Sequence, residues 1–301
     1  MSNYDYHIPV LLNQCIEGLN LKPNGIYVDV TFGGGGHSRE ILKNLPEGAR
    51  LIAFDKDADA QNNAKTIEDS RFTFIKSDFR FIKNHLKFLG ISEVDGVLAD
   101  LGVSSHQFDE AERGFSLRFD GPLDMRMDTA NPKTAAKVIE ESSDEELIKI
   151  FREFGELYNA RSIVNNIRKS ESMQSIADLK EALKGLYKPK EEHKFLARVF
   201  QALRIEVNDE IPALHELLTQ CTEILKPGGR LVVMSYHSLE DRPVKNLIKA
   251  GNFEGEIKKD FYGNPQLLYK SITRKPIIPT EEEIEQNSRA RSAKLRIAEK
   301  L

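Results

Sequence analysis

Four consecutive glycines, Gly33–Gly36, separate two runs of opposite character. Before them, residues 26–32 are rich in β-branched and aromatic side chains; after them, residues 38–45 have helical apolar spacing. Glycines adopt positive φ freely and let a ligand come close to the main chain. The first turn of the helix adds N–H groups that have no partner within the helix, and a partial positive charge. Because open α/β sheets bind nucleotides at such strand–helix turns, the loop predicts a nucleotide site in an α/β fold.

Strand-like and helix-like runs alternate on both sides of this loop, which is the pattern of a parallel sheet covered by helices. A helix is predicted over 209–225, and Lys226–Gly229 has the composition of a helix stop followed by a turn. The predicted strands, in chain order, are 26–32, 50–55, 72–75, 94–100 and 230–236.

The residues between the fourth and fifth strands follow a different pattern. Ser143–Glu146 has the Ser and Glu of a capping box, and residues 147–154 place apolar side chains on one helix face. This helical spacing continues without a strand pattern. We therefore expect an α/β domain formed by residues 1–132 and 206–301, with a helical domain inserted at 133–205.

Composition excludes several classes of protein. The chain has 301 residues and a net charge of −4, which argues against coating nucleic acid through bulk charge but allows a local basic groove. No apolar run approaches about 18 residues, so we expect no membrane-spanning helix. Met1–His7 lacks the basic-then-apolar order of a secretory signal. The two cysteines, Cys15 and Cys221, make neither a disulfide framework nor a metal cluster, so we expect a cytoplasmic protein without a metal.

Asp55 ends the second predicted strand, 22 residues after Gly33. A carboxylate there is placed to accept hydrogen bonds from the two hydroxyls of a ribose, although capping the next helix is the alternative. A dinucleotide loop needs G-x-G-x-x-G, and here Ser38 or Arg39 stands at the third glycine. The run resembles instead the loop of class I S-adenosylmethionine-dependent methyltransferases, with Thr31 in place of the first glycine.

Two further strand ends carry polar or aromatic residues. Asp78 and Phe79 follow the third strand, where the phenyl ring is a candidate to stack on an adenine or, equally, to pack in the core. Asp100 ends the fourth strand, which in such a fold faces the transferable methyl group.

Longer runs with a specific order of residue types extend over nearly the whole chain. They are His7–Leu12, Thr31–Ser38, Asp100–Ser105, Glu112–Ser116, Asp120–Asp128, Phe200–Asn208, Tyr236–Arg242 and Arg289–Arg296. Together these runs resemble the bacterial RsmH (MraW) family, which methylates the exocyclic N4 of a cytidine in the decoding region of 16S ribosomal RNA. The resemblance is weakest in the helical insertion.

The resemblance implies a Rossmann-like class I fold, S-adenosylmethionine as cofactor, and 16S rRNA in the small ribosomal subunit as partner. We expect the insertion to be an RNA-recognition domain, and the oligomeric state stays open between monomer and homodimer. Many amino-methyltransferases carry D/N/S-P-P-Y/F after the fourth strand, where this chain has Asp100-Leu-Gly-Val. The implied cofactor-binding residues are Gly34, Gly35, Gly36, His37, Asp55, Phe79, Asp100 and Gln107.

Methylation at N4 requires acceptors that hold the N4–H groups and draw the ring-delocalised lone pair toward the methyl. Asp100, Tyr236 and His237 are the candidate catalytic residues. Residues 237–241 have an alternative interpretation as a helix start capped by Ser238, with acidic residues suiting the helix dipole. Methylation at C5 would need a thiolate, and both cysteines lie in helix-like stretches, where they are expected to be small core residues.

Basic residues in three groups are candidates for phosphate contacts in a local groove. The alternative interpretation, which is the more frequent one for such groups, is an ordinary solvated face. The candidates are Arg113, Arg118, Arg126, Lys188, Lys190, Lys194, Arg198, Arg204, Arg289, Arg291, Lys294 and Arg296.

Three other classes of protein stay open: an NAD-dependent oxidoreductase, a catalytically idle RNA-binding or assembly factor, and a DNA or protein methyltransferase. A thermal shift by S-adenosylhomocysteine but not NADH would exclude the first.

Overall fold

The structure is a computed structural model that describes residues 9–301. His7 and Ile8 of the first motif lie outside the described residues. The chain divides into two compact units, each described by itself below. The first combines the residues up to Gly102 with Ile211–Leu301, and the second is Val103–Glu210. In the described part of the chain, no helix is both long enough and apolar enough to cross a membrane.

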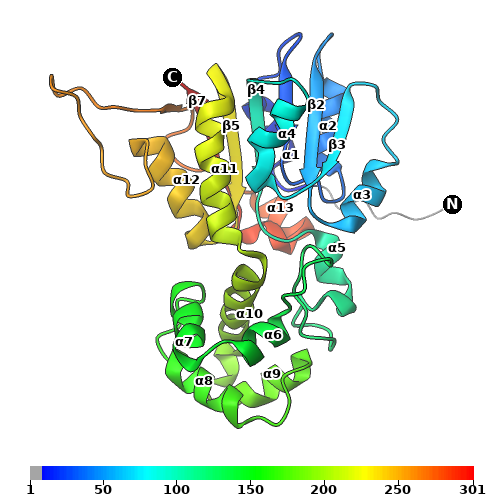
Figure 1. The fold of residues 1–301 in the computed structure, drawn as a ribbon, viewed down its shortest axis with the longest axis vertical. Helices are drawn as coiled ribbons and strands as arrows, with labels where there is room; N and C mark the ends of the chain where they lie inside the picture. Colours follow the sequence, from blue (N-terminus) through cyan, green and yellow to red (C-terminus); the bar gives the residue numbers. More distant parts are fainter. Residues whose placement is uncertain (1–8) are drawn as a thin grey trace. The chain divides into compact units, whose positions relative to one another are not determined.

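The first unit is built on a seven-stranded sheet with the order β3-β2-β1-β4-β5-β7-β6 (Figure 1). Neighbouring strands from β3 to β5 are parallel, whereas β7 runs antiparallel to both β5 and β6. Continuous apolar runs form the central strands because both faces of a parallel sheet are covered. The strands are β1 Ile26–Asp29, β2 Arg50–Asp55, β3 Phe72–Lys76, β4 Val94–Asp100, β5 Leu225–Ser235, β6 Tyr269–Ser271 and β7 Lys294–Lys300.

Helices cover both faces of this sheet. On one face, α1 and α2 bury residues such as Cys15 and Ile41 against Leu98. On the other, α4, α11 and α12 bury residues such as Leu86 and Leu217 in a separate cluster. The helices associated with this unit are α1 Leu12–Leu19, α2 Gly36–Asn44, α3 Ala58–Ala64, η1 Phe79–Phe81, α4 Ile82–Phe88, α11 Glu210–Ile224, α12 Ser238–Ala250, α13 Glu281–Gln286 and η4 Ser288–Ser292.

β1 and β5 differ most from the sequence prediction. β1 ends at Asp29, although the Val30 N–H still donates to the Leu98 carbonyl of β4 at 2.9 Å. β5 begins at Leu225 rather than residue 230, because Leu225 already pairs with β4. The register then shifts across 226–229, so the predicted Pro-Gly turn is accommodated as an irregularity inside the strand.

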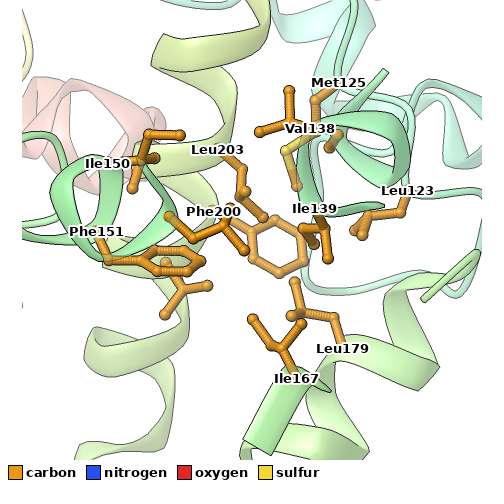
Figure 2. Packing of buried hydrophobic residues seen from close by; sticks show 14 of the residues in the cluster. Leu123, Met125, Val138, Ile139, Ile150, Phe151, Ile167, Leu179, Phe200 and Leu203 are labelled. Carbon is orange, nitrogen blue, oxygen red and sulfur yellow. The ribbon is translucent and has the colours of Figure 1, made fainter. Parts of the chain in front are cut away.

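The second unit is helical, and Figure 2 shows its core, where Phe200 and Leu203 of α10 lie among side chains of the neighbouring helices. The capping box is confirmed: Ser143 N–H donates to Glu146 Oε2 at 2.8 Å, and Ser143 Oγ accepts from Glu146 N–H. Its helices are α5 Ser105–Asp109, η2 Ala111–Arg113, α6 Ala135–Glu141, α7 Asp144–Glu153, α8 Ala160–Lys169, α9 Ile176–Leu183, η3 Pro189–Glu191 and α10 Glu192–Asn208.

The second unit starts thirty residues before the predicted insertion at 133–205. The physical reason is burial: Phe115, Leu123 and Met125 precede the helical periodicity but belong to the helical core. Within Val103–Glu210, pairing of the β type is limited to a single bridge between Pro122 and Ser175. Loop residues without periodicity therefore supply part of this core, which a search for helical spacing does not detect.

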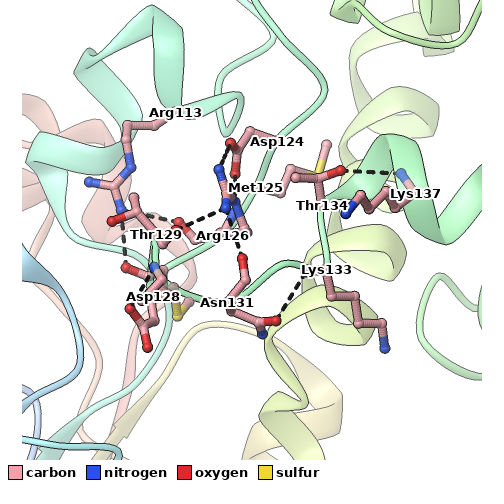
Figure 3. Close-up of polar contacts among 12 residues, drawn as sticks. Arg113, Asp124, Met125, Arg126, Asp128, Thr129, Asn131, Lys133, Thr134 and Lys137 are labelled. Atoms are coloured by element: carbon pink, nitrogen blue, oxygen red, sulfur yellow. Dashed lines mark hydrogen bonds and ion pairs between the residues drawn. The ribbon is translucent and has the colours of Figure 1, made fainter.

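The Asp120–Asp128 motif forms an internally bonded loop in this unit (Figure 3). The guanidinium of Arg126 donates to both carboxylate oxygens of Asp124, at 2.8 and 2.7 Å. Its remaining nitrogen donates to the carbonyls of Thr129 and Asn131 at 2.9 and 2.8 Å. The specific order of residues in this motif is therefore explained by a folded loop that one arginine, Arg126, holds together.

Asn208, at the end of α10, holds the same loop from the other side. Its side chain accepts from the Met127 N–H and donates to the Met125 carbonyl, both at 2.7 Å. Met125 has a φ of 62°, a strained value for a non-glycine residue. The amide of Asn208 is buried, so its bonds replace those that water would otherwise make.

Candidate active site

The glycine loop joins β1 to α2, and Gly34 differs from Gly35 and Gly36 in what surrounds it. A Cβ at Gly35 would lie 2.7 Å from the Phe32 ring, and one at Gly36 would lie 2.3 Å from Cγ of Pro9. A Cβ at Gly34 would meet nothing within 4 Å. Packing therefore explains Gly35 and Gly36, whereas Gly34 leaves a bare stretch of main chain facing open space.

Asp29, at the end of β1, pins this loop to the first turn of α2. Its buried carboxylate accepts from Ser38 Oγ at 2.6 Å and from the Thr31 N–H at 3.1 Å. Burial raises the pKa of Asp29, while the bond from Ser38 acts in the opposite direction. The role of Asp29 is therefore to hold the conformation of the glycine loop.

Asp55, at the end of β2, connects the glycine loop to the start of the next helix. Its Oδ2 accepts from the Gly33 N–H at 2.7 Å, and its Oδ1 accepts from the Asp57 N–H at 2.9 Å. A carboxylate oxygen has two lone pairs, so each oxygen can accept one further donor. Desolvation raises the pKa of Asp55 to about 6, against the opposing effect of the two N–H groups.

Asp100, at the end of β4, is the centre of a second polar group. Its Oδ1 accepts from the Tyr236 hydroxyl at 2.9 Å, and its Oδ2 lies 3.7 Å from His37 Nδ1. Its own N–H donates to Thr31 Oγ1 at 2.7 Å. Desolvation raises the pKa of Asp100 to about 6, although His37 and Tyr236 favour the ionised form. Three predicted site residues from separate elements thus meet at the ends of β4 and β5.

Tyr236 keeps its proton over the physiological pH range. Burial, followed by the nearby Asp100 carboxylate, raises the pKa of the phenol well above its ordinary value. His37 is also buried, and its Nε2 lies 3.2 Å from the Val10 carbonyl. Both rings are therefore fixed at one end by polar contacts within the unit.

Glu240 is a member of this site that the sequence analysis did not select as a candidate. Only 3% of it is exposed, and its Oε2 accepts from the Tyr236 N–H at 2.8 Å. Its Oε1 lies 3.0 Å from His237 Nε2. Helix α12 begins at Ser238 with His237 at the N-cap position, so the expectation that Ser238 caps the helix was wrong by one residue.

Phe79 and Gln107 have local structural contacts. Phe79 opens η1 and packs against the first unit's core, next to Asp78, whose carboxylate accepts from Lys56 Nζ at 3.1 Å. Gln107 belongs to the second unit, where it forms a capping box with Ser104. Gln107 is therefore not among the predicted residues that the first unit brings together.

Four of the predicted phosphate-binding arginines are engaged inside the fold, which corrects that expectation. Arg126 is held as described above, and Arg113 donates to two carbonyls of the same loop. Arg204 pairs with both carboxylate oxygens of Glu210, at 2.8 and 2.9 Å. Arg296 of β7 pairs in the same way with Asp241, at 2.7 and 3.1 Å. When two guanidinium nitrogens both bind the same carboxylate, its negative charge largely neutralises the arginine, which then attracts a phosphate less.

Both cysteines are buried and reduced, as expected. Cys15 lies in α1 and Cys221 in α11. Burial raises the pKa of Cys15 well above its ordinary value and that of Cys221 to about 12. Neither sulfur is therefore a thiolate at neutral pH, and the interpretation of both as small core residues is confirmed.

A parallel sheet with an antiparallel β7 inserted beside β5, and polar residues gathered where β1, β2 and β4 end, defines a Rossmann-like class I methyltransferase fold. The chain belongs to the MraW methylase family, whose model matches residues 5–301.

Similar proteins from two bacteria cover nearly the full length of this chain. A protein of Bacteroides thetaiotaomicron, named Ribosomal RNA small subunit methyltransferase H, is 54% identical over 98% of this chain and 97% of its own. A protein of the same name from Christiangramia forsetii is 55% identical over 99% and 98%. Among solved structures, an rRNA methylase from Streptococcus thermophilus is similar at 12% identity, with a TM-score of 0.44 over 98% of this chain and 99% of that chain.

Proposed function

We propose that this protein uses S-adenosylmethionine to methylate the exocyclic N4 of one cytidine in the decoding region of 16S rRNA, in the cytoplasm. Its family is a methylase family, and relatives about 54% identical carry the name of a small-subunit rRNA methyltransferase. The observation that carries the proposal is the convergence of the Gly34 loop, Asp55 and Asp100 at neighbouring strand ends.

The strand ends fit the proposed cofactor. The uncovered main chain at Gly34 leaves room for a ligand, and the free lone pairs of Asp55 suit the two hydroxyls of a ribose. Phe79, next along the sheet edge, is assigned to the adenine. S-adenosylmethionine supplies an electrophilic methyl group on a sulfonium centre. Gly35, Gly36 and His37 complete the proposed contacts in the first unit, and Gln107 is the proposed contact from the second.

Asp100 is proposed to hold the amino group of the cytosine. The N4 lone pair is delocalised into the ring, so an acceptor on N4–H is needed to direct electron density toward the methyl. With a pKa of about 6, Asp100 is ionised at neutral pH and can accept such a bond. Tyr236 and Thr31 fix its orientation, which matters because alignment alone can supply roughly 7–11 kcal/mol.

Methylation at nitrogen agrees better with these residues than methylation at C5. The C5 reaction needs a thiolate, and both described cysteines have raised thiol pKa values and lie within helices. The target base must be unpaired or flipped, because a stacked and paired N4 is out of reach. Tyr236 and His237 are proposed to line the pocket that receives it.

The second unit, Val103–Glu210, is proposed to recognise the RNA. Its exposed lysines Lys188, Lys190 and Lys194 lie in and beside η3 and at the start of α10, where they are accessible to a phosphate backbone.

The oligomeric state is a separate question. Light scattering on the purified protein would decide between the monomer and the homodimer.

The proposal is tested with purified protein, labelled S-adenosylmethionine, and small ribosomal subunits from cells that lack this enzyme. The RNA is digested and the labelled nucleoside identified, with free 16S rRNA assayed in parallel. We expect label in N4-methylcytidine at a single site. Label in another nucleoside, or none despite measurable cofactor binding, would contradict the proposal. A thermal shift by S-adenosylhomocysteine but not NADH separates it from an oxidoreductase.

A further inference from the structure

The segment between α12 and β6 displays two aromatic rings that contribute nothing to the core. Phe261 is 97% exposed and Tyr262 is 85% exposed. Their ring centroids are 5.6 Å apart and the rings are nearly perpendicular. In Figure 1 this part of the chain, in orange, extends away from the sheet. Exposing two large rings side by side is costly in water, so their position calls for a binding role.

A tight turn, Asp260–Asn264, fixes these rings. The Asp260 carboxylate accepts from the N–H groups of Tyr262 and Asn264 at 2.9 and 2.8 Å. The Asp260 N–H donates to the Asn264 carbonyl at 2.9 Å, and Gly263 closes the turn with a φ of 86°. We call Asp260–Asn264 the aromatic turn. Its bonds hold the rings outward before any partner binds, which reduces the entropy lost on binding.

The segment that carries the aromatic turn is basic. Residues 256–275 contain five Lys or Arg and only two acidic residues, although the chain as a whole is acidic. One of the two acids, Asp260, has its charge occupied by the turn, and those same N–H groups lower its pKa. The basic residues, all exposed, are Lys258, Lys259, Lys270, Arg274 and Lys275.

We propose that the aromatic turn is a second RNA contact, in which Phe261 and Tyr262 stack on unpaired bases while the lysines contact the phosphates. This combination of aromatic faces and cations is the one that binds single-stranded nucleic acid without strict sequence preference. An apolar pocket on a protein partner would gain from the rings but would leave five cations without complementary charge. The inference rests on the proposed function, because it assumes an RNA substrate.

A double variant, F261A/Y262A, removes the rings and keeps the residues that form the turn. Base–aromatic stacking at this strength predicts a KM for small subunits that rises at least about tenfold, with kcat and the affinity for S-adenosylhomocysteine unchanged. The matched control is F88A, which removes another exposed aromatic ring, 89% exposed, from α4. If the wild-type protein methylates subunits and the double variant has the wild-type KM, the inference is wrong while the proposed function stands. If the wild type does not methylate subunits, the proposed function itself fails.

Two further measurements address the contact directly. Replacing two cations, in K258A/K259A, is expected to reduce the slope of log affinity against log salt by roughly 1.4. The chain contains no tryptophan, so F261W places a single tryptophan at the turn, and its emission can be excited separately from that of the tyrosines. A single-stranded oligocytidylate is expected to quench F261W but not F88W. No quenching by either the oligonucleotide or the subunits, or quenching by anionic phospholipid vesicles alone, would overturn the inference.

Discussion

The hydroxyl of Tyr236 donates a 2.9 Å hydrogen bond to Oδ1 of Asp100, and so joins the end of β5 to the end of β4. The two residues are 136 positions apart in the chain. Because the phenol stays protonated, the tyrosine is the donor whenever the Asp100 carboxylate is ionised. It orients the carboxylate while leaving one lone pair of Oδ1 and those of Oδ2 for a further donor.

Replacing Asp100 by Asn is expected to lower the rate of methylation and, at high pH, to raise the stability of the protein. Methylation is expected to fall at least about a hundredfold, since the acceptor charge is lost. The folded-state pKa of about 6 lies above the unfolded value, so ionisation of wild-type Asp100 costs stability as the pH rises from about 4 to 6. D100N should therefore be more stable than wild type by about 3 kcal/mol at pH 8, and most of this difference should be gone near pH 4. Urea unfolding at both pH values checks this, with the exposed Glu93→Gln as control; a difference that does not change with pH would contradict it.

Removing the Asp55 carboxylate is expected to weaken S-adenosylhomocysteine binding about tenfold in Asp55→Ala, the scale of one charged hydrogen-bond site. Ribose hydroxyls favour the ionised carboxylate, so wild-type affinity should fall as the pH drops below about 6, whereas D55A should show a flatter profile. Calorimetric titrations between pH 5 and 8 measure both effects. Asp59→Asn, in the first turn of α3, is the control and should keep the wild-type profile. Equal affinities for D55A and wild type would remove Asp55 from the cofactor site.

Replacing Gly34 or Gly36 of the glycine loop by alanine should have different effects on stability and on cofactor binding. Gly34→Ala adds a methyl group to open space, so the unfolding midpoint should stay near the wild-type value while cofactor affinity falls. Gly36→Ala places its methyl group 2.3 Å from Pro9 Cγ and should cost about 1–3 kcal/mol of stability. Thermal unfolding with and without S-adenosylhomocysteine distinguishes the two. A G34A protein that binds the cofactor normally would show that the open space is not part of the site.

Glu240 acts through the residues that it holds, so it is a positioning residue. Glu240→Ala leaves the buried Tyr236 N–H without its acceptor, and kcat should fall about tenfold with little change in S-adenosylhomocysteine affinity. Glu240→Gln keeps an oxygen that can accept from this N–H and should restore most of kcat. If both variants lose kcat and cofactor affinity in parallel, Glu240 has a general structural role instead.

Some strands could be predicted from the sequence and others could not. β2 and β4 have the predicted bounds, because each is a short apolar run buried on both faces. β7 is not among the predicted strands, although Lys294–Lys300 alternates charged and apolar residues, which is the pattern of a half-buried strand. Its basic residues favour an interpretation as phosphate contacts instead, and its partner could not be predicted because antiparallel pairing with β5 joins residues distant in the chain.

The residues of the candidate site also divide into those that could be predicted from the sequence and those that could not. The glycine loop, Asp55 and Asp100 could be predicted because they follow recognisable strands. Glu240 could not, since its function depends on a carboxylate that turns back toward the main chain of Tyr236. The sequence also suggests more arginines for phosphate binding than the structure leaves available. The reason is related: a sequence shows a charged residue but not the partner that neutralises it, as Arg296 and Asp241 illustrate.

The pairing of β4 with β5 has a consequence for the synthesis of the chain. These adjacent strands are separated by the whole of Val103–Glu210, so a nascent chain that has completed β4 carries an unpaired strand edge while more than a hundred residues are translated. The helical unit is one contiguous segment, so all of it is synthesised before β5 and it can fold during this interval. Slowed translation across it would prolong exposure of the β4 edge and increase the demand for chaperones that shield such edges.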